Sequence, residues 1–471
     1  MAPIGLVLSA ASNNSTQTSM VNFDRFLFAF TIGSHIILVT SSISIIIIIA
    51  IAEFLAIRLN DNHYANLVKR LTKVFTISFG VGTASGVVMA FELTILFPGF
   101  MTLVSDTGAI TLFYAEIFAF FLETFALVLF VYYADSFKSR YSHWLLSILI
   151  AAGTLFSAVF ITMVNAWMNT PDGFDITAFL QSGKVIGANP WATFATPSTF
   201  AEISHVVVTT IFTGSMILGV YIAYRLLKSP YQEEKTMLNK GLKLVWFVSL
   251  PMLVLAGVSG SNNMATLLQL QPLKYAAYDA NTAPGTNFPE RLFGTLSPNG
   301  SYSGGITIPG VQSFLASSET GVRELPGLSQ FPQSDWPPLI VHTTFDLMVL
   351  GGFILGGYFL LYFIQWFFKK KPFESRLMLY LQIVAGFVSL LVYELGWVTD
   401  EVGRQPWVVY NVLRVSQAAN YTPSIIIPGS LIVVFYLVLI PTTYYFFARV
   451  FYSRNEPEHP EVMEVSGGVN Y

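Results

Sequence analysis

Nine long apolar segments divide this sequence, and they constrain its fold more than any other feature. They lie at about residues 23–57, 70–98, 109–134, 142–168, 199–227, 242–270, 337–368, 377–398 and 425–450. A helix needs about 20 apolar residues to cross the hydrocarbon core of a bilayer. Only 11% of the residues are charged, whereas a typical soluble domain carries about 25%. The sequence therefore predicts an all-α integral membrane protein with about nine transmembrane helices.

The distribution of lysine and arginine predicts how these helices are oriented. Of 24 such residues, 17 lie in alternate connecting segments or at the adjoining helix ends, and 7 lie on the opposite side. Because the positive excess marks the cytoplasmic side, we expect the N-terminus outside and the C-terminus inside. The predicted parts are an exposed N-terminal tail (1–22), a nine-span membrane domain (23–450) and an inner C-terminal tail (451–471). The longest loop, 271–336, falls on the outer side, and a loop of this length is usually functional or disordered.

The composition and the histidines narrow the possible functions. The chain has no cysteine, which excludes iron–sulfur clusters and thiolate-ligated haem, and its net charge of −3 argues against nucleic acid as a partner. His35 and His205 lie inside apolar segments, where each is either a hydrogen-bonded structural residue or a metal ligand. His143, at the inner start of the fourth span, is expected to be solvated. A thioether partner such as Met348, at about the depth of His205, would complete the His/Met ligation of a low-spin haem.

The third span contains two acids, Glu116 and Glu123. They are two helical turns apart, so both lie on one face of the helix, about 10 Å from each other. Either each is neutral and hydrogen-bonded to a neighbour, or the two form a proton path between the inner side and a buried centre. Arg25 stands ten residues before His35. It either reaches to the membrane interface or neutralises a buried anion such as a haem propionate.

A cluster of ionisable and aromatic residues follows the eighth span. Glu401 and Arg404 lie between Trp397 and Trp407. Charges at membrane depth are costly, and they mark functional sites by default. The charge distribution places this cluster near the outer face.

Lys274 and Asp279 stand at the head of the long outer loop, beside the expected membrane surface. They belong either to an ordinary solvated loop or to a binding edge for a polar ligand that lives in the bilayer, such as the head group of a quinol.

Several stretches resemble subunit I of the cytochrome bd quinol oxidases, over about residues 23–450. In chain order, the matching motifs are Arg25-Phe-Leu-Phe-Ala-Phe-Thr31 leading to His35, Ala119-Phe-Phe-Leu-Glu123, Asn165-Ala-Trp-Met-Asn-Thr-Pro171, His205 with Thr213-Gly-Ser-Met-Ile-Leu-Gly219, Gln271-Pro-Leu-Lys274, and Gly403-Arg404-Gln405-Pro406-Trp407. The last is the strongest marker, because it looks like that family's signature after its eighth span. Several motifs in the right order on nine spans make the resemblance specific.

The resemblance implies three haems. His205 and Met348 would be the axial ligands of a low-spin haem b, which passes electrons because its iron has no open position. His35 and Glu401 would each ligate one high-spin haem, and a single protein ligand leaves a position where dioxygen binds. One high-spin haem would be haem b and the other haem d or a further haem b. The resemblance leaves open which residue holds which.

The resemblance also implies roles for the other candidates. Glu116 and Glu123 would conduct protons to the reduction site, Trp397 would lie between haems, and Arg25 and Arg404 would pair with haem propionates or with developing charge.

The implied activity is that of a terminal oxidase of the cell membrane. Lys274 and Asp279 would bind membrane quinol near the outer face, and dioxygen would be reduced to water with protons from inside. The implied partner is a second oxidase subunit, either subunit II or a paralogue of this chain, together with small accessory subunits.

Three positions depart from the family's pattern. Asp279 stands where the family usually has glutamate, Asp346 stands where well-studied members have arginine, and Ala90 replaces an expected glutamate.

Two other functions remain as alternatives to the oxidase. A paralogous subunit that carries haem or only supports a partner is the first alternative, although the full set of ligand candidates argues against an empty scaffold. A secondary transporter is a further alternative, but paired repeats and broken helices are not evident.

Overall fold

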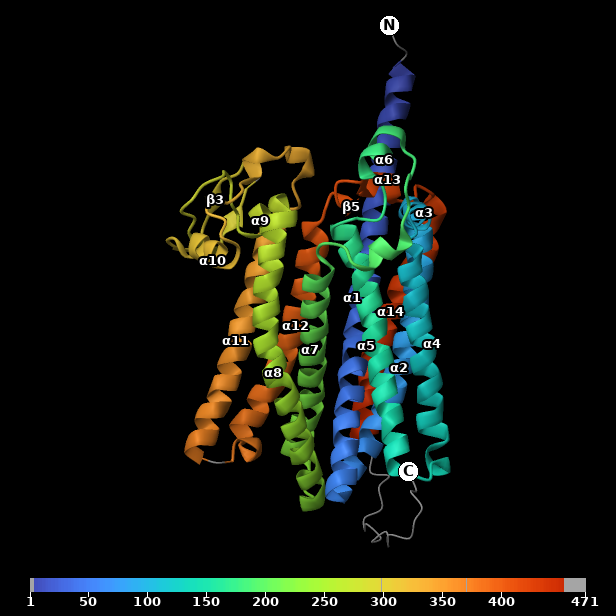
Figure 1. Ribbon diagram of the computed structural model, residues 1–471, viewed down its shortest axis with the longest axis vertical. Coiled ribbons are helices and arrows are strands. Elements are labelled where there is room, and N and C mark those ends of the chain that lie inside the picture. The colour runs from blue at the N-terminus through green and yellow to red at the C-terminus, as the bar shows by residue number, and fades with distance from the viewer. Residues whose placement is uncertain (1–3, 298, 370, 453–471) are drawn as a thin grey trace.

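The computed structural model describes residues 4–297, 299–369 and 371–452 of the chain. Within that part, nine helices are long and apolar enough to cross a membrane, which confirms the predicted number of spans. They run side by side as one elongated bundle (Figure 1). Their bounds are α1 Ile4–Leu59, α2 Asn62–Leu96, α4 Ile110–Tyr132, α5 Arg140–Asn169, α7 Thr199–Lys228, α8 Gln232–Leu270, α11 Ile340–Lys369, α12 Arg376–Gly403 and α14 Ile426–Tyr452.

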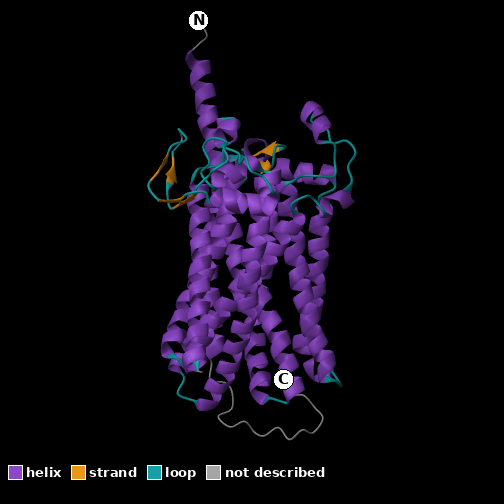
Figure 2. Ribbon diagram, turned by 60° about the vertical axis from the view of Figure 1, so that its left-hand side comes forward, coloured by secondary structure: helices purple, strands orange, loops and turns teal. Residues whose placement is uncertain are grey.

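The shorter elements gather at one end of the bundle (Figure 2). The helices among them are α3 Pro98–Thr107, α6 Ile176–Ser182, α9 Pro272–Tyr278, α10 Val311–Thr320 and α13 Val415–Ala418. The strands are β1 Glu290–Leu292, β2 Thr295–Leu296, β3 Tyr302–Ser303, β4 Ile306–Ile308, β5 Trp407–Val409 and β6 Leu413–Arg414. The strands pair as three antiparallel ribbons, β1 with β4, β2 with β3 and β5 with β6.

Helix ends differ from the predicted spans where polar residues continue a helix. α1 begins at Ile4, so the segment predicted as an N-terminal tail is helical from that residue. α8 begins at Gln232, ten residues before the predicted span, because hydrophobicity marks the membrane portion of a helix and not its end. The predicted C-terminal tail lies almost entirely outside the described residues, since α14 ends at Tyr452.

The spanning helices pack as two neighbouring groups. α1, α2, α4 and α5 form one group with α14 against α1 and α2, while α7, α8, α11 and α12 form the other. α7 joins the groups because it contacts α1 and α5 as well as α8 and α12. Gly214 of α7 allows this close approach, since a Cβ there would overlap the carbonyl oxygen of Thr40 and the side chain of Ser44 on α1. Small residues serve this purpose at helix contacts in membranes.

The histidine expected to be solvated, His143, is buried, so that prediction is wrong. Its side chain is 3% exposed, and its Nδ1 lies 2.5 Å from Oε1 of Glu53 on α1. A hydrogen-bonding partner on a neighbouring helix offsets the cost of burying a polar group, and such a partner cannot be seen in the local sequence.

The loop 271–336 is folded and packs on the bundle. Leu273, Ala276 and Leu328 are buried together with Val341 and Phe345 of α11. The loop and the segment after α12 lie at the same end as the N-terminal end of α1, while α14 runs to the opposite end (Figure 1). The residues predicted to bind quinol are therefore near the end of α12 that carries Glu401 and Arg404.

Candidate functional site

A cavity of about 570 Å³ lies between α5, α7, α8, α9, α11 and α12, and it collects several of the predicted site residues. His205 of α7, Met348 of α11, Trp397 of α12 and Lys274 of α9 all line it. Gly396 also lines it, and a Cβ at this glycine would come within 3.3 Å of Sδ of Met348. A largely apolar cavity with a few convergent polar groups is the usual form of a cofactor site.

The chemistry of His205 and Met348 fits a haem held by a histidine and a thioether. Nδ1 of His205 lies 3.0 Å from Oγ of Ser259 on α8, and the Ser259 hydroxyl donates to the carbonyl oxygen of Ala256. With the hydroxyl hydrogen directed there, the imidazole donates through Nδ1–H, and this arrangement leaves the Nε2 lone pair for iron. Histidine ligands of metals almost always donate their other ring N–H in this way.

His35 of α1 has the same environment in another part of the bundle. Its Nδ1 lies 2.8 Å from Oγ of Ser85 on α2, and the Ser85 hydroxyl donates to the carbonyl oxygen of Gly82. Tyr436 of α14 donates to the Ser85 carbonyl at 2.9 Å, which ties α14 to this position. His35 lies outside the lining of the large cavity, so the two histidines lie in different parts of the bundle.

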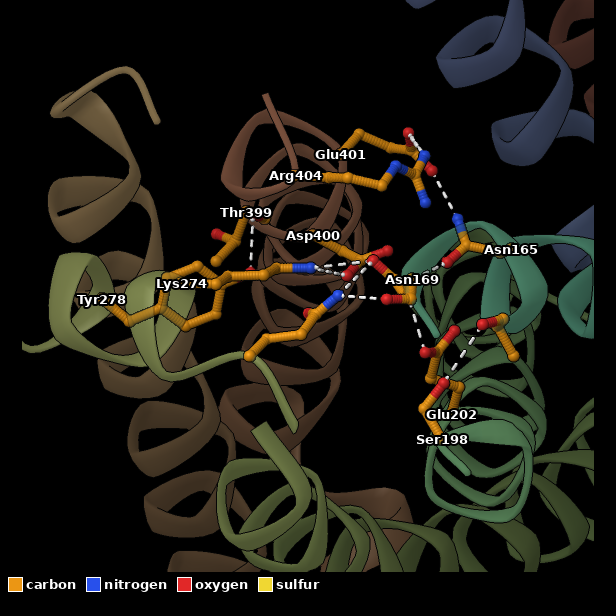
Figure 3. A network of polar contacts seen from close by, with 12 residues as sticks. Asn165, Asn169, Ser198, Glu202, Lys274, Tyr278, Thr399, Asp400, Glu401 and Arg404 are labelled. Carbon is orange, nitrogen blue, oxygen red and sulfur yellow. Dashed lines mark hydrogen bonds and ion pairs between the residues drawn. The ribbon is translucent and has the colours of Figure 1, made fainter. Parts of the chain in front are cut away.

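Glu401 has a protein partner for each carboxylate oxygen (Figure 3). Arg404 donates to Oε2, and the Asn165 side chain of α5 donates to Oε1 at 2.5 Å. The Arg404 side chain is 2% exposed and the Glu401 side chain 32%. Each carboxylate oxygen accepts one hydrogen bond and keeps a further lone pair for a metal.

The glycine before Arg404 lets α9 approach α12. A Cβ on Gly403 would lie 2.7 Å from the Tyr278 hydroxyl oxygen and 2.9 Å from Cε of Lys274. Tyr278 donates to the Thr399 carbonyl oxygen at 2.8 Å, which fixes this contact. Trp407 ends the motif that begins at Gly403. The Cζ atom of Arg414 lies 4.2 Å from the centroid of the Trp407 ring.

Lys274 and Glu401 are connected by a chain of polar contacts (Figure 3). Lys274 Nζ donates to Oδ1 of Asp400 at 2.5 Å and reaches Oδ1 of Asn169 at 3.4 Å. The Asn169 amide donates to Oδ1 of Asn165 at 2.8 Å, and Asn165 continues to Glu401. Asn165 and Asn169 are one turn apart on α5, so this chain runs along a single helix face.

Glu202 is a site residue that the sequence analysis did not identify. It lines the cavity three residues before His205, and its Oε1 accepts a hydrogen bond from Asn169 at 3.1 Å. The only sequence signal was an acid one turn from a candidate ligand on the same helix.

Lys274 and Asp279 belong to different networks, although both lie at the head of the loop. Asp279 is buried and accepts a hydrogen bond from Gln312 of α10 at 2.6 Å. Burial, and after it the negative charge of Glu290, raises the pKa of the Asp279 carboxyl to about 8. Asp279 is absent from the cavity lining, whereas Lys274 is part of it.

Asp346 and Ala90 are the other two positions that depart from the family's pattern. Asp346 is buried in a polar contact, whereas Ala90 is exposed. The Asp346 carboxylate accepts the backbone N–H of Phe293 at 2.7 Å and lies 3.5 Å from Nε2 of His342. The hydrogen bond from Phe293 thus attaches the loop to α11. An arginine at position 346 could not accept this hydrogen bond, because its side chain has no acceptor atom. Ala90 is exposed on the surface of α2.

Glu116 and Glu123 both face α5, in agreement with their spacing. Ser157 of α5 donates to Oε1 of Glu116 at 3.0 Å. Gly153, one turn earlier on α5, makes room for Glu123, because a Cβ there would be 2.6 Å from the Cβ of Glu123. Arg25 of α1 is half-buried and forms none of the ion pairs found among the described residues.

Comparison with known proteins identifies the family. Residues 23–455 match the sequence profile of cytochrome bd terminal oxidase subunit I. The putative cytochrome bd menaquinol oxidase subunit I of Bacillus subtilis is 32% identical over 437 residues, which cover 92% of this chain and 96% of the relative. The cytochrome bd ubiquinol oxidase subunit 1 of the same organism is 26% identical and covers 84% of this chain and 85% of its own.

A solved structure agrees with these sequence relatives. The bd oxidase from Geobacillus thermodenitrificans superposes with a TM-score of 0.84 at 31% identity, over 92% of this chain and 98% of the other. The chain therefore belongs to the cytochrome bd terminal oxidase subunit I family, the haem-containing membrane core subunit of enzymes that oxidise quinol with dioxygen.

Proposed function

We propose that this subunit oxidises membrane quinol at the end of the bundle that carries the loop 271–336 and reduces dioxygen deeper in the bundle. The observation that carries this proposal is the cavity that His205, Met348, Trp397 and Lys274 share. The proposed haem ligands and the proposed quinol-binding cation line the same cavity, and this supports electron transfer between quinol and haem at that end. The loop end is the outer side in this proposal, as the distribution of lysine and arginine predicts.

The haem assignments follow the donor chemistry of the residues. His205 and Met348 hold a low-spin haem b, and His35 and Glu401 each hold a high-spin haem, one of them haem b and the other haem d or a further haem b. When bound, these haems supply electron transfer and the reduction of dioxygen. Trp397 lines the cavity with His205 and would separate neighbouring haems, while Arg25 and Arg404 are the cations available to haem propionates.

Protons enter and leave at opposite ends of the bundle in this proposal. Glu116 and Glu123 share the face of α4 that packs on α5, and they carry protons from the inner side. Protons from quinol leave at the loop end. This arrangement separates charge across the membrane without a pump.

A second subunit completes the enzyme in this proposal. The surface of α4 exposes Tyr114, Phe118, Phe121 and Phe125, which suits either lipid or an apolar partner helix. We assign the partner as subunit II or a paralogue of this chain, and we assign small accessory subunits to the remaining surface. The enzyme is placed in the cell membrane as a multi-pass protein.

The test is a dithionite-reduced minus oxidised spectrum of the purified protein, with quinol-driven oxygen consumption measured on the same sample. Low-spin and high-spin haem bands together with oxygen consumption support the oxidase. Haem bands without oxygen consumption would favour an electron-carrying paralogue, and the absence of haem bands would favour a transporter. A pyridine haemochrome assay identifies the haem types.

Glu202 is proposed to accept a proton from quinol. In the network around it, Lys274 pairs with Asp400 and Arg404 with Glu401, whereas Glu202 forms no ion pair among the described residues. It can therefore gain and lose a proton without breaking an ion pair. We expect Glu202→Gln to lower quinol-driven kcat about 100-fold, the usual effect of losing a positioned proton acceptor, while the low-spin haem spectrum is retained.

The matched control is Glu319→Gln, an exposed acid on α10, which should leave kcat unchanged. Glu202→Asp should recover part of the rate because it keeps an acid. Full activity in Glu202→Gln would show that another base accepts the proton.

The buried carboxyl of Asp279 should make the stability of the loop 271–336 depend on pH. A carboxyl whose pKa is raised on folding stabilises the structure at low pH, and that contribution is lost as pH rises from the unfolded value near 3.8 through about 8. The groups around it, Glu290, Tyr275 and Gln312, offer no cation to offset the charge. We expect limited proteolysis of 271–336 to accelerate as pH rises from about 4 to about 8, and to change little above that range.

Asp279→Asn should remove most of this pH dependence, because the amide oxygen still accepts from Gln312 but no longer titrates. Glu319→Gln, in the same loop, should keep it. The same proteolysis profile in wild type and Asp279→Asn would assign the dependence to another group.

A further inference from the structure

Both candidate haem histidines face a serine that is followed by a glycine. Ser85-Gly86 of α2 stands beside His35, and Ser259-Gly260 of α8 stands beside His205. The two pairs lie on helices that are far apart in the sequence, and each serine meets Nδ1 of its histidine at 2.8 or 3.0 Å. The same arrangement therefore occurs twice in one chain.

The serine hydroxyls fix the tautomer of each imidazole. A hydroxyl has one hydrogen, and in both serines it points to a carbonyl oxygen one turn earlier, at 2.9 Å for Ser85 and 3.3 Å for Ser259. With the hydroxyl hydrogen in that position, the serine oxygen accepts a hydrogen bond from Nδ1–H of the imidazole. In both rings the lone pair is then on Nε2, the atom that faces away from the serine.

The glycines allow the serine-bearing helices to approach the edge of the ring. A Cβ on Gly86 would be 3.2 Å from Cε1 of His35, and a Cβ on Gly260 would be 3.4 Å from Cε1 of His205. At Gly86 a larger residue would push on the carbon between the two ring nitrogens, whereas a Cβ at Gly260 would make an ordinary van der Waals contact with that carbon. The serine thus sets the protonation of each histidine, and the small neighbour lets its helix approach the ring.

We propose that Ser85 and Ser259 are positioning residues that set the midpoint potentials of the two histidine-ligated haems. This inference rests on the proposed function, in which His35 and His205 ligate iron. An Nδ1–H hydrogen bond makes the imidazole a stronger donor to the metal. A stronger axial donor favours the ferric state and lowers the potential, and such hydrogen bonds are among the levers by which a protein tunes a haem.

The two serines make separable predictions, each for a different haem, and both are measured by spectroelectrochemical titration of the holoenzyme. Ser259→Ala should raise the midpoint potential of the low-spin haem and leave the high-spin potentials unchanged. Ser259→Thr, which keeps the hydroxyl, should restore the original value. Ser85→Ala should raise the potential of one high-spin haem only, so each variant is a control for the other.

Ser249→Ala is a further control on α8, since its buried hydroxyl has no hydrogen-bond partner in the described chain, and it should leave every potential unchanged. If the wild-type protein shows no low-spin haem, the proposed function fails. If all haems are present and the Ser259→Ala potential equals that of wild type, the proposed function stands and this inference is overturned. A shift of every potential in either variant would also overturn it.

Discussion

His205→Ala is expected to remove the low-spin haem b signal while part of the high-spin haem remains. The cavity offers Met348 as the second axial ligand, and a thioether is a weak ligand that cannot hold a haem alone against water. Quinol-driven oxygen consumption should fall to background, because electrons then have no entry point. Difference spectra and oxygen consumption, measured on the same preparation, check both parts.

The high-spin haems should survive in His205→Ala because His35 lies on a different helix pair, beside Ser85. His63→Ala provides a matched control, since that histidine is partly exposed and pairs with Glu233 at the start of α8. It should leave the spectrum unchanged. A persistent low-spin signal in His205→Ala would show that another residue ligates this haem.

Arg404→Ala is expected to destabilise the protein by about 3 kcal/mol, the lower end of the range for breaking a buried ion pair. The lower end applies because the Glu401 side chain is 32% exposed, so water compensates part of the loss. The change also frees Glu401 from one of its two partners. We therefore expect loss of one high-spin haem in addition to the lower free energy of unfolding.

Arg404→Lys is the matched variant, because it keeps the positive charge but loses the planar arrangement of donors. It should lose less stability than Arg404→Ala. Denaturant titration in detergent and haem content per polypeptide are the measurements. If the free energy of unfolding and haem content in Arg404→Ala match wild type, the pair with Glu401 makes no net contribution.

The spans and the shared face of Glu116 and Glu123 could be predicted because they depend on local properties. Apolar length fixes a membrane helix, and a seven-residue spacing fixes a common face. The family motifs could also be recognised, since they are contiguous or nearly so.

Contacts between helices could not be predicted, because they depend on how each helix is rotated and how deep it sits. Lys274 and Asp279 are close in sequence, yet Lys274 pairs with Asp400 of α12 and Asp279 with Gln312 of α10. Ser259 is 54 residues from His205. No local pattern contains either partner.

The two asparagines of α5 have a consequence for how the enzyme responds to its ligands. Asn169 contacts Lys274 and Asn165 contacts Glu401, and the amides of the two asparagines are hydrogen-bonded to each other. A molecule that draws Lys274 away from Asn169 would alter how firmly Asn165 holds Glu401. By thermodynamic reciprocity, occupancy at Glu401 would change the affinity at Lys274 by the same factor. Binding of a ligand at Lys274 and binding of a ligand at Glu401 would then be coupled through this face of α5.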